Sequence, residues 1–405
     1  MRRTVSEGRG PVRFGPPAPE AGLPALPELV EVCAAAAGRT SPEPSGGGAV
    51  LRTAARGYWW RRGLHTGEDE VAAAPGAQPL LFALLAAYDG DVLMPRPCPA
   101  WWTPQARLLG RPAYFVPTPA EAGGVPDPYA LLETVRRVRG EGGAPRVLLL
   151  SLVDDPTATV APPELVREAC EAAVDEGLHI ISDETWRDTL HRPRETVLLS
   201  PAEMWPEEVV IVSDLAGALT PAAWPAAVAR FPATTAGTAL RARTLDILTA
   251  LGALVAGPVA AAAAVALDEP EPVRARVAAA AALHARVAAA AHRAVLVSGA
   301  LARPPQAGRH LYADLGPLRA RLAGLGVTDS LELENYLSER LGMPVPGGHR
   351  FGDELGALRV RLSTGPLLGS TPEQRLESLT APAPLELPHV ARALSILGSA
   401  FDELC

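Results

Sequence analysis

Hydrophobic and polar positions alternate along the chain in blocks that predict strands and helices in turn. An apolar run from Val147 to Leu152 precedes a helical pattern from Pro162 to Glu176, and a second apolar run extends from Leu178 to Ser182. Two short apolar runs that flank an amphipathic helix are typical of a buried parallel βαβ unit. Binding sites in such sheets lie beyond the carboxyl ends of the strands, so we expect Asp154, Asp155 and Asp183, which follow these runs, to lie near a site.

The same pattern continues outside this unit and defines the predicted fold. Further strand-like runs cover residues 70–74, 91–95, 112–117 and 209–213, with helical patterns between most of them. This order predicts an α/β fold with a mainly parallel sheet. We expect an N-terminal arm over residues 1–48, a large α/β domain over 49–258, and an interdomain helix with a smaller C-terminal α/β domain over 259–405.

The sequence motifs of several segments resemble those of a known family. Residues 155–159 (DPTAT) and 181–186 (ISDETW) are similar to the Asn-Pro-Thr-Gly and Ser-Asp-Glu-x-Tyr motifs of the class I/II, fold type I pyridoxal-phosphate aminotransferases. Residues 49–63 resemble that family's Leu-Arg-x-Ala-Ile-Ala-x-Tyr helix, and residues 359–363 its Val-Arg-Ile-Ser strand. The resemblance implies a large domain with a mainly parallel seven-stranded sheet, and a homodimer whose subunit interface builds the cleft.

The resemblance also assigns expected roles to individual residues. The turn of Gly76, Ala77 and Gln78 before a helix is expected at the cofactor phosphate, which backbone N–H groups at a helix N-terminus can hold. Trp101 is a candidate to stack on the cofactor ring, Asp183 to pair with the pyridine nitrogen, and Arg361 to hold a substrate carboxylate. The guanidinium fork suits a carboxylate well.

Other family positions carry different residues here. All 37 basic residues are arginine, and the expected position of the anchor lysine holds Gly217. A Schiff base needs an amine that can lose its proton, which arginine effectively never does. The residues expected at the ring oxygen are Asp155 and Trp186, and those expected at the phosphate are Asp214, Pro225 and, from a partner subunit, Pro42. The degenerate site therefore predicts no cofactor, although pyridoxal phosphate is the ancestral one.

Three functional hypotheses remain open. The preferred one is a non-catalytic, aminotransferase-like scaffold or regulatory partner of another protein. The second is an enzyme that reuses the cleft for acid/base chemistry independent of pyridoxal phosphate on a small carboxylate, such as a reaction of specialised metabolism, with Asp155, Asp183, Asp214 and His191 as candidate catalytic groups and Arg361 as the carboxylate ligand. The third is a true transaminase, which would have to borrow a lysine from a partner.

Composition limits the remaining classes. The chain has 405 residues, 48% hydrophobic and 20% charged, and a net charge of −8, so its overall charge does not indicate a nucleic-acid partner. We expect no membrane span and a cytoplasmic location. His284 and His292 lack a third ligand, and the four cysteines have no metal or disulfide spacing, so no metal site is expected.

Overall fold

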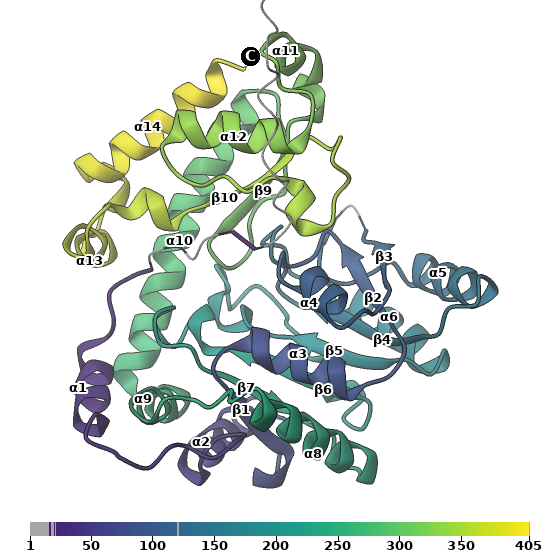
Figure 1. Cartoon of the computed structure of the whole chain (residues 1–405). Coiled ribbons are helices and arrows are strands. Elements are labelled where there is room, and N and C mark those ends of the chain that lie inside the picture. The colour runs from purple at the N-terminus through teal and green to yellow at the C-terminus, as the bar shows by residue number, and fades with distance from the viewer. Residues whose placement is uncertain (1–15, 18–19, 21, 120, 405) are drawn as a thin grey trace, which may run out of the picture.

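A seven-stranded sheet forms the centre of the larger part of the molecule, in a computed structural model that describes residues 16–17, 20, 22–119 and 121–404. The strand order is β1-β7-β6-β5-β4-β2-β3, and only β7 runs antiparallel to its neighbours among these described strands (Figure 1). The strands are β1 (Val71–Ala74), β2 (Asp91–Arg96), β3 (Ala113–Pro117), β4 (Pro145–Ser151), β5 (His179–Asp183), β6 (Val209–Asp214) and β7 (Ala227–Arg230). The predicted α/β fold with a mainly parallel seven-stranded sheet is confirmed.

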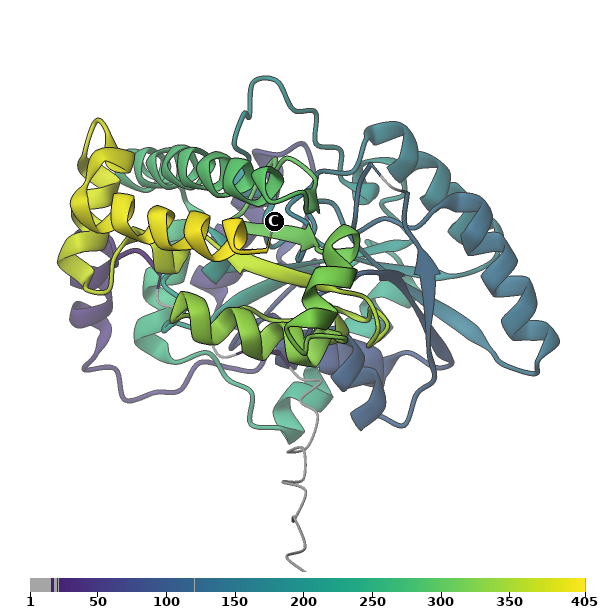
Figure 2. The same ribbon diagram turned by 90° about the horizontal axis from the view of Figure 1, so that it is seen from above.

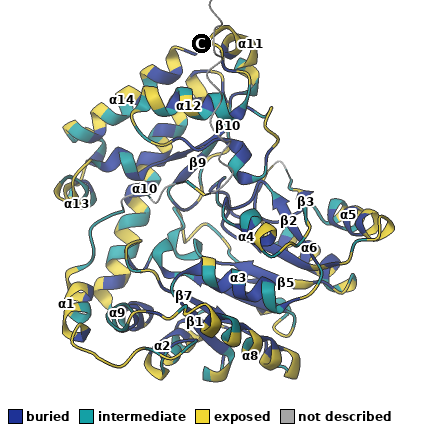
Figure 3. Ribbon diagram, in the orientation of Figure 1, coloured by how far each residue is buried: buried dark blue, intermediate teal, exposed yellow. Residues whose placement is uncertain are grey.

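The central strands are apolar along their whole length because helices cover both faces of the sheet (Figure 3). On one face, α3 (Ala77–Ala87) and α8 (Thr235–Ala250) share a core with the strands. The core of the other face includes α2 (Ala49–Trp60), α5 (Pro128–Gly140) and α6 (Pro163–Asp175). The shorter helices of this part are α1 (Pro27–Ala36), α4 (Trp102–Leu108), α7 (Pro201–Met204) and α9 (Gly257–Leu267).

The alanine-rich helix α9 packs against α1 and α2, and its buried residues belong to the same core as theirs. The expected domain boundary, between residues 258 and 259, falls inside α9, so most of the helix lies after it. That division stays a prediction, but the packing of α9 joins it to the large sheet domain. The small domain's own core begins with the next helix, α10 (Glu271–Val297).

The C-terminal part has its own sheet (Figure 2) and, from the packing of its side chains, its own hydrophobic core. Its strands are β8 (Leu301–Ala302), β9 (His310–Asp314) and β10 (Arg359–Ser363), all paired antiparallel in the order β10-β9-β8. Its helices after α10 are α11 (Arg319–Gly324), α12 (Ser330–Leu341), α13 (Pro372–Thr380) and α14 (Pro388–Asp402). Among the helices of the described ranges, none is long and apolar enough to cross a membrane.

The parallel register brings the ends of the central strands to one edge of the large sheet. Ser151 of β4 pairs with Asp183 of β5, and Asp183 pairs with Val212 of β6. The side chains that follow these strands therefore meet at the same edge, as the sequence pattern predicts. The small sheet faces this edge through Arg361, and we call the region where they meet the domain junction.

Candidate functional site

Arg361 crosses the domain junction from the small sheet. It lies on β10, where its side chain is 7% exposed, whereas the side chain of Arg359, two residues earlier, is 40% exposed. Its Nη1 donates to Asp155 Oδ1 at 2.8 Å and to Oδ2 at 3.0 Å. A buried arginine must have its charge compensated, and Asp155 provides that compensation.

The other edge of the Arg361 guanidinium is poorly satisfied. Nε is buried and has no hydrogen-bond acceptor among the residues that the structure describes. Nη2 lies 3.5 Å from Oε1 of Glu20, which also accepts the hydroxyl of Ser363 at 2.5 Å. The second oxygen of Glu20 is buried without a donor in the described ranges. The protein therefore occupies one edge of this guanidinium and leaves the other partly open.

His310 and Trp186 extend the junction on the other side of Asp155. His310 Nδ1 lies 3.5 Å from Asp155 Oδ1, and burial, followed by the charges of Arg361 and Arg309, lowers the pKa of His310 well below its usual value. The ring of Trp186 contacts His310 edge-on at 5.3 Å between centroids, and the guanidinium carbon of Arg309 lies 4.9 Å from the Trp186 centroid. Asp155 thus contacts an arginine and a histidine of the small domain.

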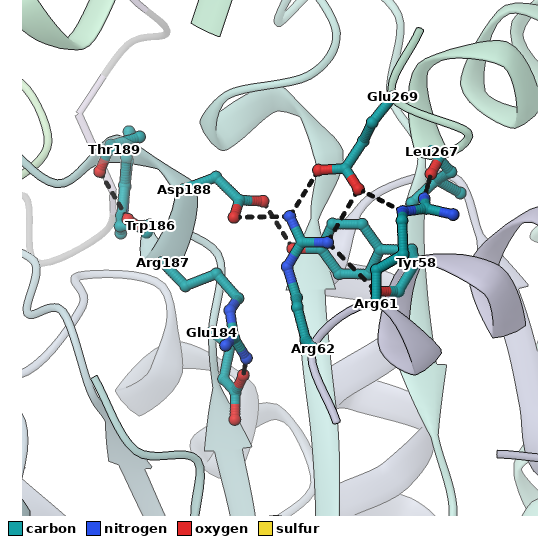
Figure 4. A network of polar contacts seen from close by, with 10 residues as sticks. All are labelled: Tyr58, Arg61, Arg62, Glu184, Trp186, Arg187, Asp188, Thr189, Leu267 and Glu269. Atoms are coloured by element: carbon teal, nitrogen blue, oxygen red, sulfur yellow. Dashed lines mark hydrogen bonds and ion pairs between the residues drawn. The ribbon is translucent and has the colours of Figure 1, made fainter. Parts of the chain in front are cut away.

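A network of charged residues holds the segment that follows β5 (Figure 4). Arg62, from the end of α2, contacts Asp188 at 2.8 Å and Glu269 at 2.6 Å. Tyr58 donates its hydroxyl to the other oxygen of Asp188 at 2.6 Å. The network links α2, the short helix η2 (Arg187–Thr189) and the connection between α9 and α10, so it fixes the place of Trp186 immediately before η2.

The turn before α3 contacts a carboxylate of the protein itself. Gly76 has a φ of 103°, and the next residue, Ala77, donates its N–H to Asp214 Oδ2 at 2.8 Å. The other oxygen of Asp214 accepts the N–H of Ala216 at 2.9 Å, and burial raises the pKa of Asp214. An N–H group at the start of α3, which could hold a phosphate oxygen, is therefore already hydrogen-bonded to Asp214.

Gly217 ends the short helix η3 (Leu215–Gly217) and packs directly against the backbone of Thr185. A Cβ atom at residue 217 would lie 2.2 Å from the carbonyl oxygen of Thr185 and 3.0 Å from its Cγ2. The Thr185 hydroxyl accepts the N–H of Asp214 at 3.1 Å, which holds the two segments together. Any side chain at this position therefore requires the backbone to shift.

Two further carboxyl groups at the strand ends have raised pKa values. Burial raises the pKa of Asp183 to about 6, although Asp183 accepts the N–H of Thr185 at 3.0 Å. Burial raises the pKa of Asp154 to about 7, against hydrogen bonds from Thr157, whose hydroxyl lies 2.6 Å away. Both groups therefore change protonation closer to neutral pH than an exposed aspartate does.

The remaining candidates from the sequence lie away from the junction or in structural contacts. Both ring nitrogens of His191 contact backbone carbonyls, of Pro305 at 3.1 Å and of Gly308 at 3.0 Å. Trp101 contacts Trp102 edge-on at 6.2 Å, and Gln78 is exposed. Sequence reasoning missed Glu20, Arg309 and His310. Of these, only Arg309 and His310 had a signal in the sequence, because they are polar residues at the start of a strand-like run.

Comparison with known proteins places the chain among aminotransferases. A model of the family described as aminotransferase class I and II matches residues 34–365. A probable aspartate/prephenate aminotransferase of Thermus aquaticus is 30% identical over 197 residues, 47% of this chain and 49% of that protein. The aspartate/prephenate aminotransferase of Thermus thermophilus is 29% identical over 197 residues, 47% of this chain and 48% of that protein. The chain thus spans about half the length of the curated relatives it matches.

Solved structures agree with this family in their fold. The aspartate aminotransferase from Thermus thermophilus with maleate superposes with a TM-score of 0.74 at 23% identity, over 95% of this chain and 90% of that one. The aromatic aminotransferase from Pyrococcus horikoshii OT3 gives 0.74 at 18% identity, over 95% and 94%. At these identities the likeness concerns the fold alone.

These matches correct one expectation from the sequence. No cofactor was expected, but the family match contradicts this, since it points to pyridoxal phosphate as the cofactor. Tested against that group, the described contacts do not fit it at two places. Asp214 already binds the N–H of Ala77 where the phosphate would lie, and a side chain at residue 217 collides with Thr185.

Family membership and the fit of one cofactor are separate questions. The family model matches residues 34–365, and the mainly parallel seven-stranded sheet agrees with the fold of the solved structures, which cover 95% of this chain. The chain therefore belongs to the class I and II aminotransferase family.

Proposed function

We propose that this aminotransferase-like chain binds a small carboxylate at Arg361 and acts as a ligand-binding or regulatory member of its family, without a Schiff base to a side chain of its own. The observation that carries the proposal is the buried Nε of Arg361, which has no acceptor among the described residues. A buried donor without a partner costs about 1–3 kcal/mol. A ligand that accepts from this donor recovers that cost.

The geometry favours a carboxylate as this ligand. Asp155 contacts Nη1 alone, so the edge formed by Nε and Nη2 can donate two parallel hydrogen bonds. Carboxylates accept such a pair well. Glu20 is the only described acid near this edge, at 3.5 Å from Nη2, and an incoming carboxylate replaces it. The names of the relatives agree with this class, because aspartate and prephenate both carry carboxylates.

The absence of a Schiff base to the chain follows from its residues. The sequence has no lysine, and arginine remains protonated. The contact of Gly217 with Thr185 further opposes any side chain at the family's anchor position. The proposal concerns covalent attachment, and pyridoxal phosphate is itself one of the ligands to be tested.

The test is a calorimetric titration of the intact chain with maleate and with succinate, followed by the variant Arg361→Gln. We expect Arg361→Gln to weaken binding by about 1.5–3 kcal/mol, the scale of a hydrogen bond to a charged group. Arg359→Gln is the matched control, because Arg359 lies on the same strand and pairs with Asp314 and Asp353 instead. Equal affinity of Arg361→Gln and the unaltered chain would refute the carboxylate site.

A second titration addresses the covalent link. Pyridoxal phosphate is added to the purified chain, and the absorbance spectrum and the mass after borohydride reduction are recorded. We expect no reduced adduct on a side chain. An adduct mapped to an internal residue would refute this part of the proposal and leave the carboxylate site untouched.

A second candidate function, acid/base catalysis on a bound carboxylate, has its own supporting observation. The pKa of Asp183 is raised to about 6 and that of Asp154 to about 7, and values near the working pH suit groups that exchange protons. Proton exchange of bound ligands in deuterated water, followed by NMR, tests this function. Exchange that Asp183→Asn abolishes would establish it in place of pure binding.

We also propose a homodimer, on the grounds of family membership. Light scattering at micromolar concentration measures the mass directly, and a monomer mass would refute the proposal. The position of Pro42, expected at a partner's phosphate from the sequence, is exposed in the single chain, as an interface residue would be.

A further inference from the structure

A second cavity, which does not include Arg361, lies beside the domain junction. Its volume is about 100 Å³, and it is bounded by the segment 22–26, by η3 with the residues after it, and by α10. Leucine and valine side chains form much of its wall, namely Leu26, Leu29, Leu219, Val273 and Val277. Its polar side chains include Arg309 and His284, together with Asp188, Thr189, Thr220 and Arg276. An apolar cavity with a few polar groups is the usual form of a small-molecule site.

Arg309 brings an unpaired positive charge to this cavity. Its guanidinium forms no hydrogen bond or ion pair with any residue in the described ranges, and its contact there is the face of Trp186 at 4.9 Å. Burial lowers the pKa of Arg309, and the charge of Glu20 opposes this effect while that of Arg361 adds to it. A partly buried arginine without a partner is a site for an anion, because an anion offsets its desolvation.

His284 brings a hydrogen-bond acceptor, and its neighbours decide which nitrogen carries the proton. The Thr364 hydroxyl lies 3.2 Å from the carbonyl oxygen of Arg309, to which it can only donate. It must therefore accept from His284 Nδ1, which lies 2.7 Å away. Burial lowers the pKa of His284 to about 3, so the ring is neutral and Nε2 carries a lone pair. Nε2 has no donor among the described residues.

The described lining of the cavity has no free carboxylate for a positively charged group of a ligand. Asp188 is the one acid among the described residues that line it, and both of its oxygens are engaged, by Arg62 at 2.8 Å and by Tyr58 at 2.6 Å. Arg276, a further lining residue, donates to the carbonyl oxygen of Pro24. A ligand with an ammonium group would therefore find no free carboxylate here, whereas a neutral hydroxyl could donate to His284.

We propose that this cavity binds a 2-hydroxycarboxylate with a short branched aliphatic body. The carboxylate accepts from Arg309, the hydroxyl donates to Nε2 of His284, and the aliphatic body lies against the leucine and valine wall. A cavity of about 100 Å³ limits the ligand to a small molecule with a short aliphatic body. Arg361 does not line this cavity, although Trp186 belongs both to the cavity and to the domain junction, and the inference does not rest on the proposed function.

Three ligands separate the contributions by calorimetry with the full chain. They are 2-hydroxy-4-methylpentanoate, 4-methylpentanoate, which lacks the hydroxyl, and 2-hydroxy-4-methylpentanamide, which lacks the charge. We expect the hydroxy acid to bind tightest, the acid without the hydroxyl to bind several-fold more weakly, and the amide at least about tenfold more weakly. Equal affinity for the hydroxy acid and the amide would overturn the proposal.

Variants assign each preference to one residue. Arg309→Gln should abolish the preference for acid over amide. His284→Asn keeps a donor for Thr364 but is too short to place an acceptor where Nε2 lies, so it should abolish only the preference for the hydroxyl. Arg359→Gln, at a residue that pairs with Asp314 and Asp353 and does not line the cavity, should leave all three affinities unchanged. If instead Arg361→Gln abolishes binding and Arg309→Gln does not, the ligand occupies the Arg361 site, and this inference fails while the proposed function stands.

One further variant covers the case in which Arg309→Gln does not fold. Ala280→Leu lies on α10, lines the cavity and touches neither polar group by hydrogen bonding. Its longer side chain fills the space for the aliphatic body, so it should lower the affinity for the hydroxy acid at least about tenfold. Unchanged affinity would overturn the proposal, because the ligand would then lie outside the cavity.

Discussion

The two sides of the domain junction differ in how far the protein itself satisfies their polar groups. On the side of the large sheet, protein atoms fill the places of the expected cofactor contacts, since Asp214 binds the N–H of Ala77 and Gly217 packs on Thr185. On the side of the small sheet, part of the Arg361 guanidinium has no acceptor among the described residues. On the first side, protein atoms satisfy the backbone N–H group of Ala77. On the second side, Nε of Arg361 has no partner among the described residues.

This difference distinguishes contacts that the fold explains by itself from a contact that a ligand would complete. Filled contacts such as that of Asp214 satisfy backbone donors and need no ligand to explain them. A buried arginine with an unmet donor lowers stability, and an apolar residue of similar volume would avoid that cost. The second side is therefore the one where a ligand explains the arrangement.

Asp155→Ala should have the largest effect, because it leaves the charge of Arg361 without its closest partner. The two side chains are 7% and 13% exposed, and breaking a buried pair costs about 3–5 kcal/mol. We expect the free energy of unfolding in urea to fall by that amount, while maleate binds more tightly to the freed arginine. Asp314→Ala is the control, since its partner Arg359 is 40% exposed, and it should cost about 1 kcal/mol or less.

A loss below about 1 kcal/mol in Asp155→Ala would contradict this picture. It would mean that solvent or Glu20 compensates Arg361 as well as Asp155 does. Unchanged affinity for maleate, with the expected loss of stability, would show that Asp155 holds the two domains together without competing for the ligand.

Gly217→Lys tests the filled side. We expect it to form no aldimine band with pyridoxal phosphate and no half-reaction with amino acids, because Asp214 still occupies the start of α3. The contact with the Thr185 carbonyl should also destabilise the protein by about 1–3 kcal/mol, as overpacking does. Gly217→Ala should show most of the same loss, since the clash begins at Cβ.

Gly140→Ala is a matched control for the glycine change, because no atom lies within 4 Å of a Cβ at that position in α5. It should leave stability unchanged or slightly raised. A bound and reacting cofactor in Gly217→Lys would instead show that the large-sheet side is still a working pocket, and the contrast between the two sides would disappear.

The sequence predicts one part of this site well and another part poorly. The alternation of apolar and polar residues predicts the strand that ends at Asp183 and the strand that carries Arg361, because local pattern determines both strands. The contact of Ser363 with Glu20 spans 343 residues, and that of Ala77 with Asp214 spans 137. Such contacts depend on how distant segments dock, and no local pattern encodes them.

The corrected expectation has the same origin. Replacement of the family's cofactor ligands indicated that no cofactor is involved, whereas the family match points to pyridoxal phosphate. Residue identities alone did not show that the side chain of Asp214 bends back to cap η3 and to bind Ala77. The fold was predictable because repeated strands and helices determine it, while the site depends on single side chains.

Asp154→Asn tests the protonation of the buried edge through the pH dependence of stability. The pKa of Asp154 is raised to about 7 in the folded protein, from about 3.9 in an unfolded chain, so the folded state binds the proton more tightly. Its contribution to stability is therefore complete below about pH 4 and is lost as the pH rises toward 7. We expect the free energy of unfolding of Asp154→Asn to rise relative to that of the unaltered chain between pH 4 and pH 7, by about 3–4 kcal/mol at about 1.4 kcal/mol for each unit of pKa difference.

Urea unfolding at a series of pH values measures this difference. Asp183, whose pKa is raised to about 6, contributes a slope of the same sign in both proteins, so only the difference between them reports on Asp154. A difference that does not change between pH 4 and pH 7 would show that Asp154 is ionised throughout this range in the folded protein.

Asp214→Ser should have the smallest effect on stability, and it tests whether the contrast between the two sides can be reversed. The change removes an acceptor from the N–H groups of Ala77 and Ala216, which lie 2.8 and 2.9 Å from the carboxylate oxygens. Serine can replace the contact to Ala216 as a cap, so we expect a loss of about 1 kcal/mol. The freed start of α3 then presents an N–H group and the positive end of the helix dipole to solvent.

Inorganic phosphate is the probe for that freed position. At constant ionic strength, phosphate should raise the melting temperature of Asp214→Ser and leave that of the unaltered chain unchanged, because in the latter the Asp214 carboxylate both occupies the N–H and repels the anion. Asp214→Asn is the control, since it removes the charge but still fills the space. If phosphate stabilises neither variant, the start of α3 has lost more than one ligand, and Pro225, within 3.9 Å of a Cβ at Gly76, is the next residue to change.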